Sequence, residues 1–129
     1  MPIFVDNIEE LTLSNNNFRK VLSTNGHSQL VVMSLKAGED IGMEVHNNVD
    51  QFFRIDSGQG KVIANGEEFE VSDGFAIVIP AGTEHNVINT SETEDLKLYT
   101  IYSPANHPDG TIHETKAEAM EYEESHHHE

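Results

Sequence analysis

Short apolar or alternating runs fill the middle of the chain and are separated by Gly, Asn, Asp and Ser. Runs of this length, rich in Val, Ile, Phe and Tyr and bounded by turn residues, predict β-strands. The predicted strands are Gln29–Leu35, Gln51–Ile55, Lys61–Ala64, Glu67–Val71, Phe75–Ile79, His85–Asn89 and Leu96–Tyr102. Their spacing is typical of a β-sandwich or small barrel, so the predicted fold is all-β.

Two predicted turns separate neighbouring strands. Asn65-Gly66 separates two of the predicted strands, and this dipeptide favours a two-residue hairpin because both of its positions adopt positive φ. Ser72-Asp73-Gly74 leads into Phe75–Ile79, a fully apolar run that ends at Pro80. Further glycines at Gly58, Gly60 and Gly82 are expected to permit the bends that follow neighbouring strands.

A helix is predicted only near the C-terminus. Thr115 followed three residues later by Glu118 matches a capping box, and it predicts a short helix through about Glu124. Thr111 and Glu114 offer an alternative start. A helix this short needs docking to persist, and we expect Ala117 and Met120 to be its apolar contacts.

Length and composition fit a single domain. The chain has 129 residues, enough to bury a core, and no stretch long enough to be a linker between two domains. We divide it into an N-terminal extension with edge strands (1–28), a barrel domain (29–103), and a C-terminal loop, short helix and acidic, His-containing tail (104–129). The core is expected to include Met33, Phe53, Ile55, Ile77, Ile79 and Tyr102.

Charge and cysteine content narrow the partners. The formal net charge is -16, which repels phosphate backbones and anionic lipid, so we expect no nucleic-acid or membrane partner. The absence of Cys rules out disulfides and thiolate ligands. The start Met1–Asp6 lacks the pattern of a signal peptide, and no run is long enough to span a membrane, so a cytoplasmic location is expected.

Candidate metal ligands gather in two places. Residues two apart in a strand face the same side, so Glu44 and His46 are predicted to point together. After the turn 47–50 the chain reverses, and Gln51 can return beside them with Phe53 and Ile55 on its face. His85 must come from a separate strand, in which Val87 and Asn89 share its face.

Other histidines are weaker candidates. His107 and His113 lie in a turn-rich segment that could fold over the barrel mouth and supply a proton carrier or a substrate contact, but a plain surface loop is the favoured interpretation. His27 is interpreted as an exposed turn residue. The run His126-His127-His128 is interpreted as a solvated end or an expression remnant rather than a metal site.

The second cluster carries a family resemblance. Gly74, Pro80, Gly82, His85 and Asn89 reproduce the second motif of the cupin superfamily: glycine, five residues, Pro-x-Gly, two residues, His, three residues, Asn. The first family motif, His-x-His followed by a Glu, is only approximated. Glu44 stands at the position of the first His, Gln51 at that of the Glu, and Gly42 lies closer to the pair than the family glycine does.

The resemblance implies a jelly-roll barrel that holds one divalent metal ion through Glu44, His46, Gln51 and His85. Two imidazoles and one carboxylate form the ligand set of open non-haem iron sites, and the Gln would bind through its carbonyl oxygen. Fe, Mn, Ni, Co and Zn all suit such a set. The alternative is a polar barrel interior held by hydrogen bonds without metal, in which a buried, unpaired Glu44 would be costly.

Small cupins of this kind often carry the label "mannose-6-phosphate isomerase-like", which describes a fold more than an activity. We keep two functional hypotheses. The first is a metal-dependent enzyme, isomerase-like or dioxygenase-like, that acts on a small oxygen-rich substrate, with His107 or His113 as proton carrier. The second is a non-catalytic module that binds a small sugar or carboxylate. The resemblance and the exposed edges of such a sheet also predict a homodimer.

Overall fold

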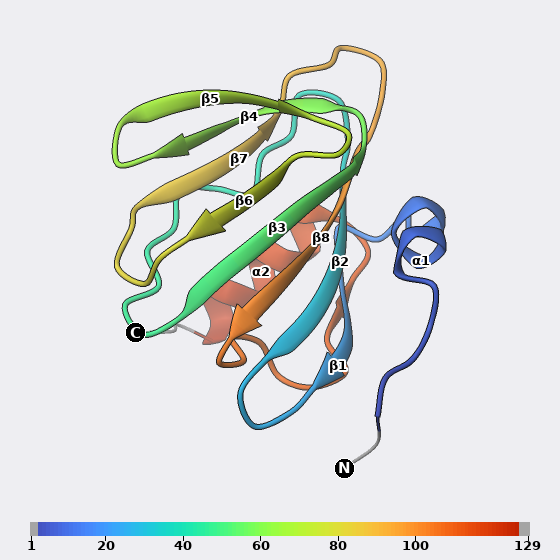
Figure 1. Ribbon diagram of the computed structural model, residues 1–129, viewed down its shortest axis with the longest axis vertical. Helices are drawn as coiled ribbons and strands as arrows, with labels where there is room; N and C mark the ends of the chain where they lie inside the picture. The colour runs from blue at the N-terminus through green and yellow to red at the C-terminus, as the bar shows by residue number, and fades with distance from the viewer. Residues whose placement is uncertain (1–2, 127–129) are drawn as a thin grey trace.

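The computed structural model describes residues 3–126, and the side chains of 3–124. Two antiparallel sheets face each other, as Figure 1 shows, with α1 and α2 lying at separate places against them. The helices are α1 (Ile8–Ser14) and α2 (Lys116–His126). The strands are β1 (Arg19–Thr24), β2 (Gln29–Leu35), β3 (Asp50–Ser57), β4 (Gln59–Ala64), β5 (Glu67–Ser72), β6 (Ala76–Ile79), β7 (His85–Asn89), β8 (Leu96–Ser103) and β9 (Ile112–His113).

The larger sheet has the strand order β6-β3-β8-β2-β1-β9, and the smaller one has the order β5-β4-β7. All seven predicted strands are present, and β2 and β7 have the predicted bounds. The all-β jelly-roll class is therefore confirmed. Alternation along β3 is also as predicted, because Gln51, Phe53 and Ile55 are buried while the residues between them are partly exposed.

Strand pairing aligns the inward-facing residues in rungs that cross the larger sheet. Gln29 on β2 lies opposite Tyr102 on β8, which lies opposite Gln51 on β3. A second rung lies two residues away on each strand, toward the other end of the barrel, and a third rung lies two residues beyond that. The second rung is Val31, Thr100 and Phe53, and the third is Met33, Leu98 and Ile55. The barrel interior thus changes from polar to apolar along its length.

The hairpin between β4 and β5 follows the prediction. Asn65 and Gly66 have φ of 49° and 83°, and Ala64 pairs with Glu67 across the turn. Gly60 has a different reason to be glycine, since a Cβ there would lie 2.5 Å from the carbonyl oxygen of Ile88 on β7. The expected role of Gly60 in a bend is therefore replaced by close packing of β4 on β7.

Three elements were not predicted individually: α1, β1 and β9. The β1 strand lies between β2 and β9 rather than at the edge of its sheet. Its sequence begins Arg19-Lys20 and is too polar to be recognised as a strand, which forms through pairing with β2 and β9. The α1 helix has Asn7 as its N-cap and packs on β2, β3 and β8.

The β6 strand shows that an apolar run need not be buried. It forms the edge of the larger sheet, and Val78 remains 69% exposed while Ile79 is buried. Phe75, just before the strand, and Phe69 on β5 are also exposed. These side chains, together with Val62 and Ile77, line an open groove of about 660 Å³ between the edges of the two sheets.

The C-terminal helix begins where predicted, since the Oγ1 of Thr115 accepts a hydrogen bond from the backbone N–H of Glu118. The expected apolar contacts were wrong. Ala117 and Met120 are exposed, and Ala119 is the helix residue buried in the core. An ion pair between Lys116 and Asp40 anchors the start of this helix.

Neither helix of the described part of the chain has the length and apolar character required to cross a lipid bilayer.

Candidate metal site

The two sequence clusters are joined by backbone hydrogen bonds. The N–H of Glu44 donates to the carbonyl of His85 (2.8 Å), and the N–H of His85 donates to the carbonyl of Glu44 (2.9 Å). Two residues further on, the N–H of Gly82 donates to the carbonyl of His46 (2.8 Å). These bonds hold segments that are some 40 residues apart in sequence side by side.

The prediction that Glu44 and His46 lie in a strand was wrong. Their segment is irregular, and Glu44 makes only an isolated bridge to His85. The predicted alternation still holds, since Glu44 and His46 are partly buried while Met43 and Val45 are about half exposed. The segment is not a regular strand. Its hydrogen bonds to the start of β7 determine which of these side chains point inward.

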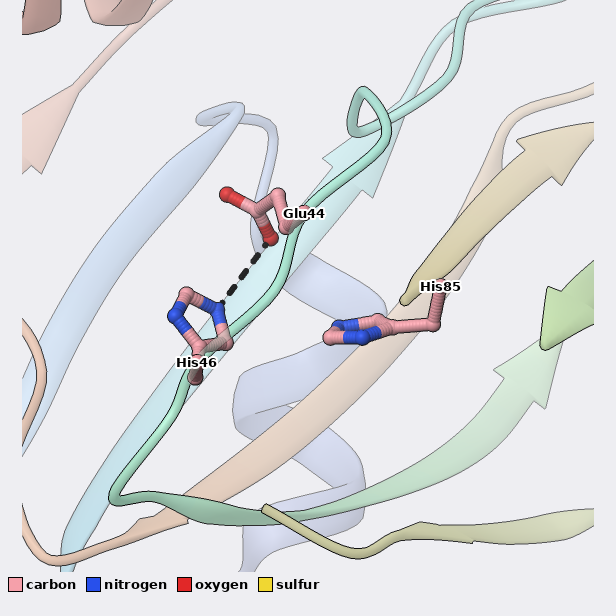
Figure 2. Close-up of side chains that lie close together, drawn as sticks. All are labelled: Glu44, His46 and His85. Carbon is pink, nitrogen blue, oxygen red and sulfur yellow. Dashed lines mark ion pairs between the residues drawn. The ribbon is translucent and has the colours of Figure 1, made fainter. Parts of the chain in front are cut away.

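The side chains of Glu44, His46 and His85 converge. Figure 2 shows them pointing into the same space, two from the irregular segment and one from the start of β7. One ligand atom from each residue lies within 4.8 Å of the others. The two imidazole rings are 5.6 Å apart between centroids. This spacing allows all three residues to ligate one ion.

A hydrogen bond to the backbone fixes the orientation of the His85 ring. Its Nδ1 lies 2.9 Å from the carbonyl oxygen of Thr83, and because a carbonyl can only accept, Nδ1 carries the proton. The lone pair is therefore on Nε2, which is buried and has no hydrogen-bond partner among the described residues. A second hydrogen bond of this kind is the usual support of a metal-binding His.

His46 and Gln51 each have a buried polar atom that no described residue hydrogen-bonds. Nε2 of His46 lies 3.5 Å from Oε1 of Glu44, an ion-pair distance without hydrogen-bond geometry (Figure 2). Nε2 of Gln51 donates to Oγ1 of Thr100 (3.0 Å), which leaves the carbonyl oxygen Oε1 buried and without a partner among the described residues. Three buried ligand atoms of the predicted set thus have no hydrogen-bond partner among the described residues, which is costly unless another group binds them.

A tyrosine not singled out as functional by the sequence lies next to these ligands. The ring of Tyr102 is 6.0 Å from that of His46, edge-on. Burial raises the pKa of Tyr102, and Glu44 raises it further while Arg19 lowers it. The hydroxyl therefore stays protonated at neutral pH. The alternation of residues along 96–102 was the signal in the sequence. It predicted that Tyr102 points inward, but it could not decide whether Tyr102 belongs to the core or lines a site.

His107 lies at the same place. Its Nε2 is 3.2 Å from the hydroxyl of Tyr102. Buried Gln29 holds the loop: its Oε1 accepts from the N–H groups of Asn106 and His107, and its Nε2 donates to the carbonyl of His107 (2.7 Å). The 104–110 loop is thus bound to the polar end of the barrel, which makes His107 a neighbour of the ligand cluster rather than a plain surface residue.

His113 has a different environment. It is buried on β9, and its Nδ1 lies 3.3 Å from NH1 of Arg19. A guanidinium can only donate, so Nδ1 accepts. Burial and the charge of Arg19 lower the pKa of His113, which favours the neutral ring. His113 therefore supports Arg19 and is a poor candidate for an acid.

The remaining candidates have structural roles or fall outside the description. His27 is exposed in the turn before β2, as expected. Asn89 is buried and ties three segments together: it donates to the carbonyls of Leu35 and Glu94 and accepts from the N–H of Ser91. The side chains of His126-His127-His128 lie outside the described residues.

Comparison with known proteins finds a match to the family model described as "Cupin domain" over residues 31–102. The uncharacterized protein YrkC of Bacillus subtilis is 53% identical over 128 residues, covering 94% of this chain and 68% of that protein. The uncharacterized protein L612 of Acanthamoeba polyphaga mimivirus is 48% identical over 113 residues, covering 85% of this chain and 71% of that protein.

Among solved structures, BH2720 from Bacillus halodurans is 49% identical, covers 92% of this chain and 93% of its own, and superposes with a TM-score of 0.89. KdgF from Halomonas sp. is 23% identical, with a TM-score of 0.63 over 68% of this chain and 78% of its own. The second similarity, at this identity, concerns the fold alone.

Proposed function

This chain belongs to the cupin family, and on that premise we propose that it binds one divalent metal ion through Glu44, His46, His85 and Gln51 and uses it in an enzymatic reaction on a small oxygen-rich substrate. The observation that carries the proposal is the set of buried donor atoms without partners among the described residues: Nε2 of His46, Nε2 of His85 and Oε1 of Gln51. All three are atoms with which these side chains bind metals.

The donor set fits such an ion. Two imidazole nitrogens, one carboxylate and one amide oxygen suit Fe(II), Mn(II), Ni(II), Co(II) or Zn(II). A cation would also remove the cost of holding the Glu44 carboxylate in a partly buried place. When bound, the ion would act as a Lewis acid toward a substrate oxygen or activate dioxygen.

Acid–base chemistry would come from Tyr102 and His107. A protonated phenol beside His46 can donate a hydrogen bond to a substrate oxygen, and His107, 3.2 Å from that hydroxyl, can accept or return a proton. The presence of these polar groups favours an enzyme over a module that only binds. Sugars and keto acids have the oxygen atoms that such a site would bind, which suits isomerase-like or dioxygenase-like reactions.

Metal analysis tests the first half of the proposal. The protein is purified with the C-terminal His cluster removed and compared with Glu44→Ala, His85→Ala and the control His27→Ala, which removes an exposed imidazole far from the cluster in sequence. We expect about one ion per chain in the wild type and control and a loss of more than tenfold in affinity in the other two. Equal metal content in all four proteins would contradict the site.

The second half of the proposal, enzymatic turnover of a small oxygen-rich substrate, is tested with a panel of compounds. We expect oxygen uptake or aldose–ketose exchange with some member of a sugar and keto-acid panel, and a loss of about 10²–10⁴-fold in kcat for His107→Gln. Metal and ligand binding without any turnover across the panel would instead support the non-catalytic binding module.

We also propose a homodimer formed through the free edge of β6. Val78 and Phe75 are exposed there, and the open groove between β5 and β6 extends the apolar surface. Since a second copy would bring acidic chains together, dimerisation should strengthen with salt. Sedimentation of wild type and Val78→Asp tests this, and a monomeric wild type at all salt concentrations would contradict it.

A further inference from the structure

We propose that Asn86 is a positioning residue of the candidate metal site, because its side chain holds a β-bulge at Gly42 that turns Glu44 and His46 into the barrel. The proposal rests on the proposed function, since it concerns the geometry of the same ligands. Three observations support it: the register of the ligand segment against β7, the backbone of Gly42 and the hydrogen bonds of Asn86.

The segment that carries Glu44 contains one residue more than the part of β7 beside it. Asp40 is bridged to Ile88 and Glu44 to His85, so four steps along the segment correspond to three along β7. An extra residue on one side of an antiparallel pair is a β-bulge, and it changes the direction in which the following side chains point. The bulge lies between Asp40 and Glu44.

Burial on the two sides of the bulge shows this change of direction. Ile41 is 8% exposed and belongs to the core together with Val87, to whose carbonyl the N–H of Ile41 donates (2.9 Å). Regular alternation from Ile41 would turn Met43 and Val45 inward and both candidate ligands of the segment outward. Met43 and Val45 are instead 50% and 46% exposed, and Figure 2 shows the ligands pointing into the site. The bulge is therefore what directs two of the ligands inward.

Gly42 has the backbone conformation of such a bulge. Its φ is 104°, a value that residues with a side chain rarely adopt. A Cβ at Gly42 would meet nothing within 4 Å. The requirement for glycine at this position therefore comes from the backbone conformation rather than from lack of space.

Asn86 holds the bulge from the neighbouring strand. Its Oδ1 accepts a hydrogen bond from the N–H of Gly42 (2.9 Å), and its Nδ2 donates to Oδ2 of Asp40 (2.8 Å). The other carboxylate oxygen of Asp40 pairs with Lys116 at the start of α2. Asn86 is 7% exposed and follows His85 directly, so the two side chains lie on opposite faces of β7. Asn86 thus acts on the ligands through the backbone and does not bind the ion itself.

Metal affinity tests this role against a matched buried asparagine. Asn15 is 6% exposed and exchanges hydrogen bonds with Asn17 after α1, so Asn15→Leu removes a similar amide elsewhere. Proteins with the C-terminal His cluster removed are titrated with Co²⁺ by calorimetry. We expect Asn86→Leu to bind Co²⁺ at least about tenfold more weakly than wild type, and Asn15→Leu to bind as wild type does. Wild-type affinity in Asn86→Leu, or an equal loss in both variants, would overturn the proposal.

A second pair of variants perturbs the bulge without removing a hydrogen-bonding side chain. Gly42→Ala strains the backbone at the bulge, and Gly74→Ala imposes a similar strain at a φ of 93° before β6, where a Cβ also meets open space. We expect both to lower stability in urea unfolding and only Gly42→Ala to lower the affinity for Co²⁺. An affinity unchanged by Gly42→Ala would contradict a role of the bulge in placing the ligands.

An exchange of side chains tests the hydrogen bonds themselves. The double variant Asp40→Asn/Asn86→Asp keeps the total charge and offers the same donor and acceptors in reversed positions. We expect its affinity for Co²⁺ to be close to that of wild type. A double variant that binds as weakly as Asn86→Leu would show that these hydrogen bonds do not hold the bulge.

Failure of the proposed function gives a different result. A wild type that binds no Co²⁺ would contradict the metal site, whereas amide exchange in metal-free protein still measures the bulge. The N–H groups of Glu44 and His85 donate to each other's carbonyls, and we expect both to exchange at least about tenfold faster in Asn86→Leu than in Asn15→Leu. Equal exchange rates in the two variants would overturn the role of Asn86.

Discussion

The two ends of the barrel interior are built from the same strands but held together differently. At one end the inward residues of β2, β3 and β8 are Met33, Ile55 and Leu98, all fully buried apolar side chains. At the other end the same strands present Gln29, Gln51 and Tyr102, and the segment before β3 adds Glu44 and His46. One end is stabilised by close packing. The other depends on hydrogen bonds and contains polar atoms that have no partner within residues 3–124.

The difference teaches how a small domain can carry a site. The apolar end supplies the stability that allows three buried polar atoms at the polar end to remain without a hydrogen-bond partner in the described part of the chain. Each buried polar atom without a partner costs stability, so this arrangement persists only because the packed end fixes the strands. The two ends should therefore respond to different perturbations.

The largest expected effect on stability comes from the apolar end. Leu98→Ala should lower the free energy of unfolding by about 2–5 kcal/mol, because it leaves a cavity in a packed core. Urea unfolding measures this, and metal content measured on the folded protein should stay that of the wild type. Loss of metal together with stability would show that the two ends are not independent.

Removal of metal should act on the polar end. If the ion is present at about a hundred times its dissociation constant, chelation with EDTA should lower the free energy of unfolding by about 2.7 kcal/mol. The same decrement is expected in Leu98→Ala, and none in His85→Ala, as measured by thermal unfolding with and without EDTA. An equal EDTA effect in His85→Ala would place the ion elsewhere.

A smaller effect is expected at the loop that borders the polar end. Gln29→Leu removes three hydrogen bonds to the backbone of Asn106 and His107 and should cost about 1–3 kcal/mol. Hydrogen exchange of those two amides should accelerate. Gln59→Leu, at an exposed position on β4, is the matched control and should leave both unchanged. Unaltered exchange in Gln29→Leu would mean that packing rather than hydrogen bonding holds the loop.

The smallest expected effect is a pH dependence from His113. Its pKa in the folded protein is lowered below the ordinary 6.5, so at acid pH the unfolded chain binds a proton that the native chain does not. Stability should therefore fall as the pH drops through about 6.5, and His113→Gln should flatten this slope. Urea unfolding of metal-free protein at about pH 7.5 and about pH 5.5 measures it. Identical slopes in both proteins would contradict the assignment.

Local patterns in the sequence were sufficient for most strands and for two of the turns. Alternation along β3 predicted that Gln51 and Phe53 share the buried face of the strand, and Asn65-Gly66 predicted the hairpin between β4 and β5. They failed where a feature depends on neighbours: β1 is a strand because β2 and β9 pair with it, and β6 is exposed because it lies at an edge. An apolar run looks the same in sequence at the edge and at the centre of a sheet.

For the candidate site, the sequence by itself determined which ligand types are on offer, since the residues at 44, 46, 51 and 85 have nitrogen and oxygen atoms and the chain has no cysteine. Only the tertiary structure brought Tyr102, Gln29 and His107 to the same end of the barrel. Spacing along a chain can encode which side chains share a local face. It does not encode which distant segments pair, because that choice is made by the packing of the whole domain.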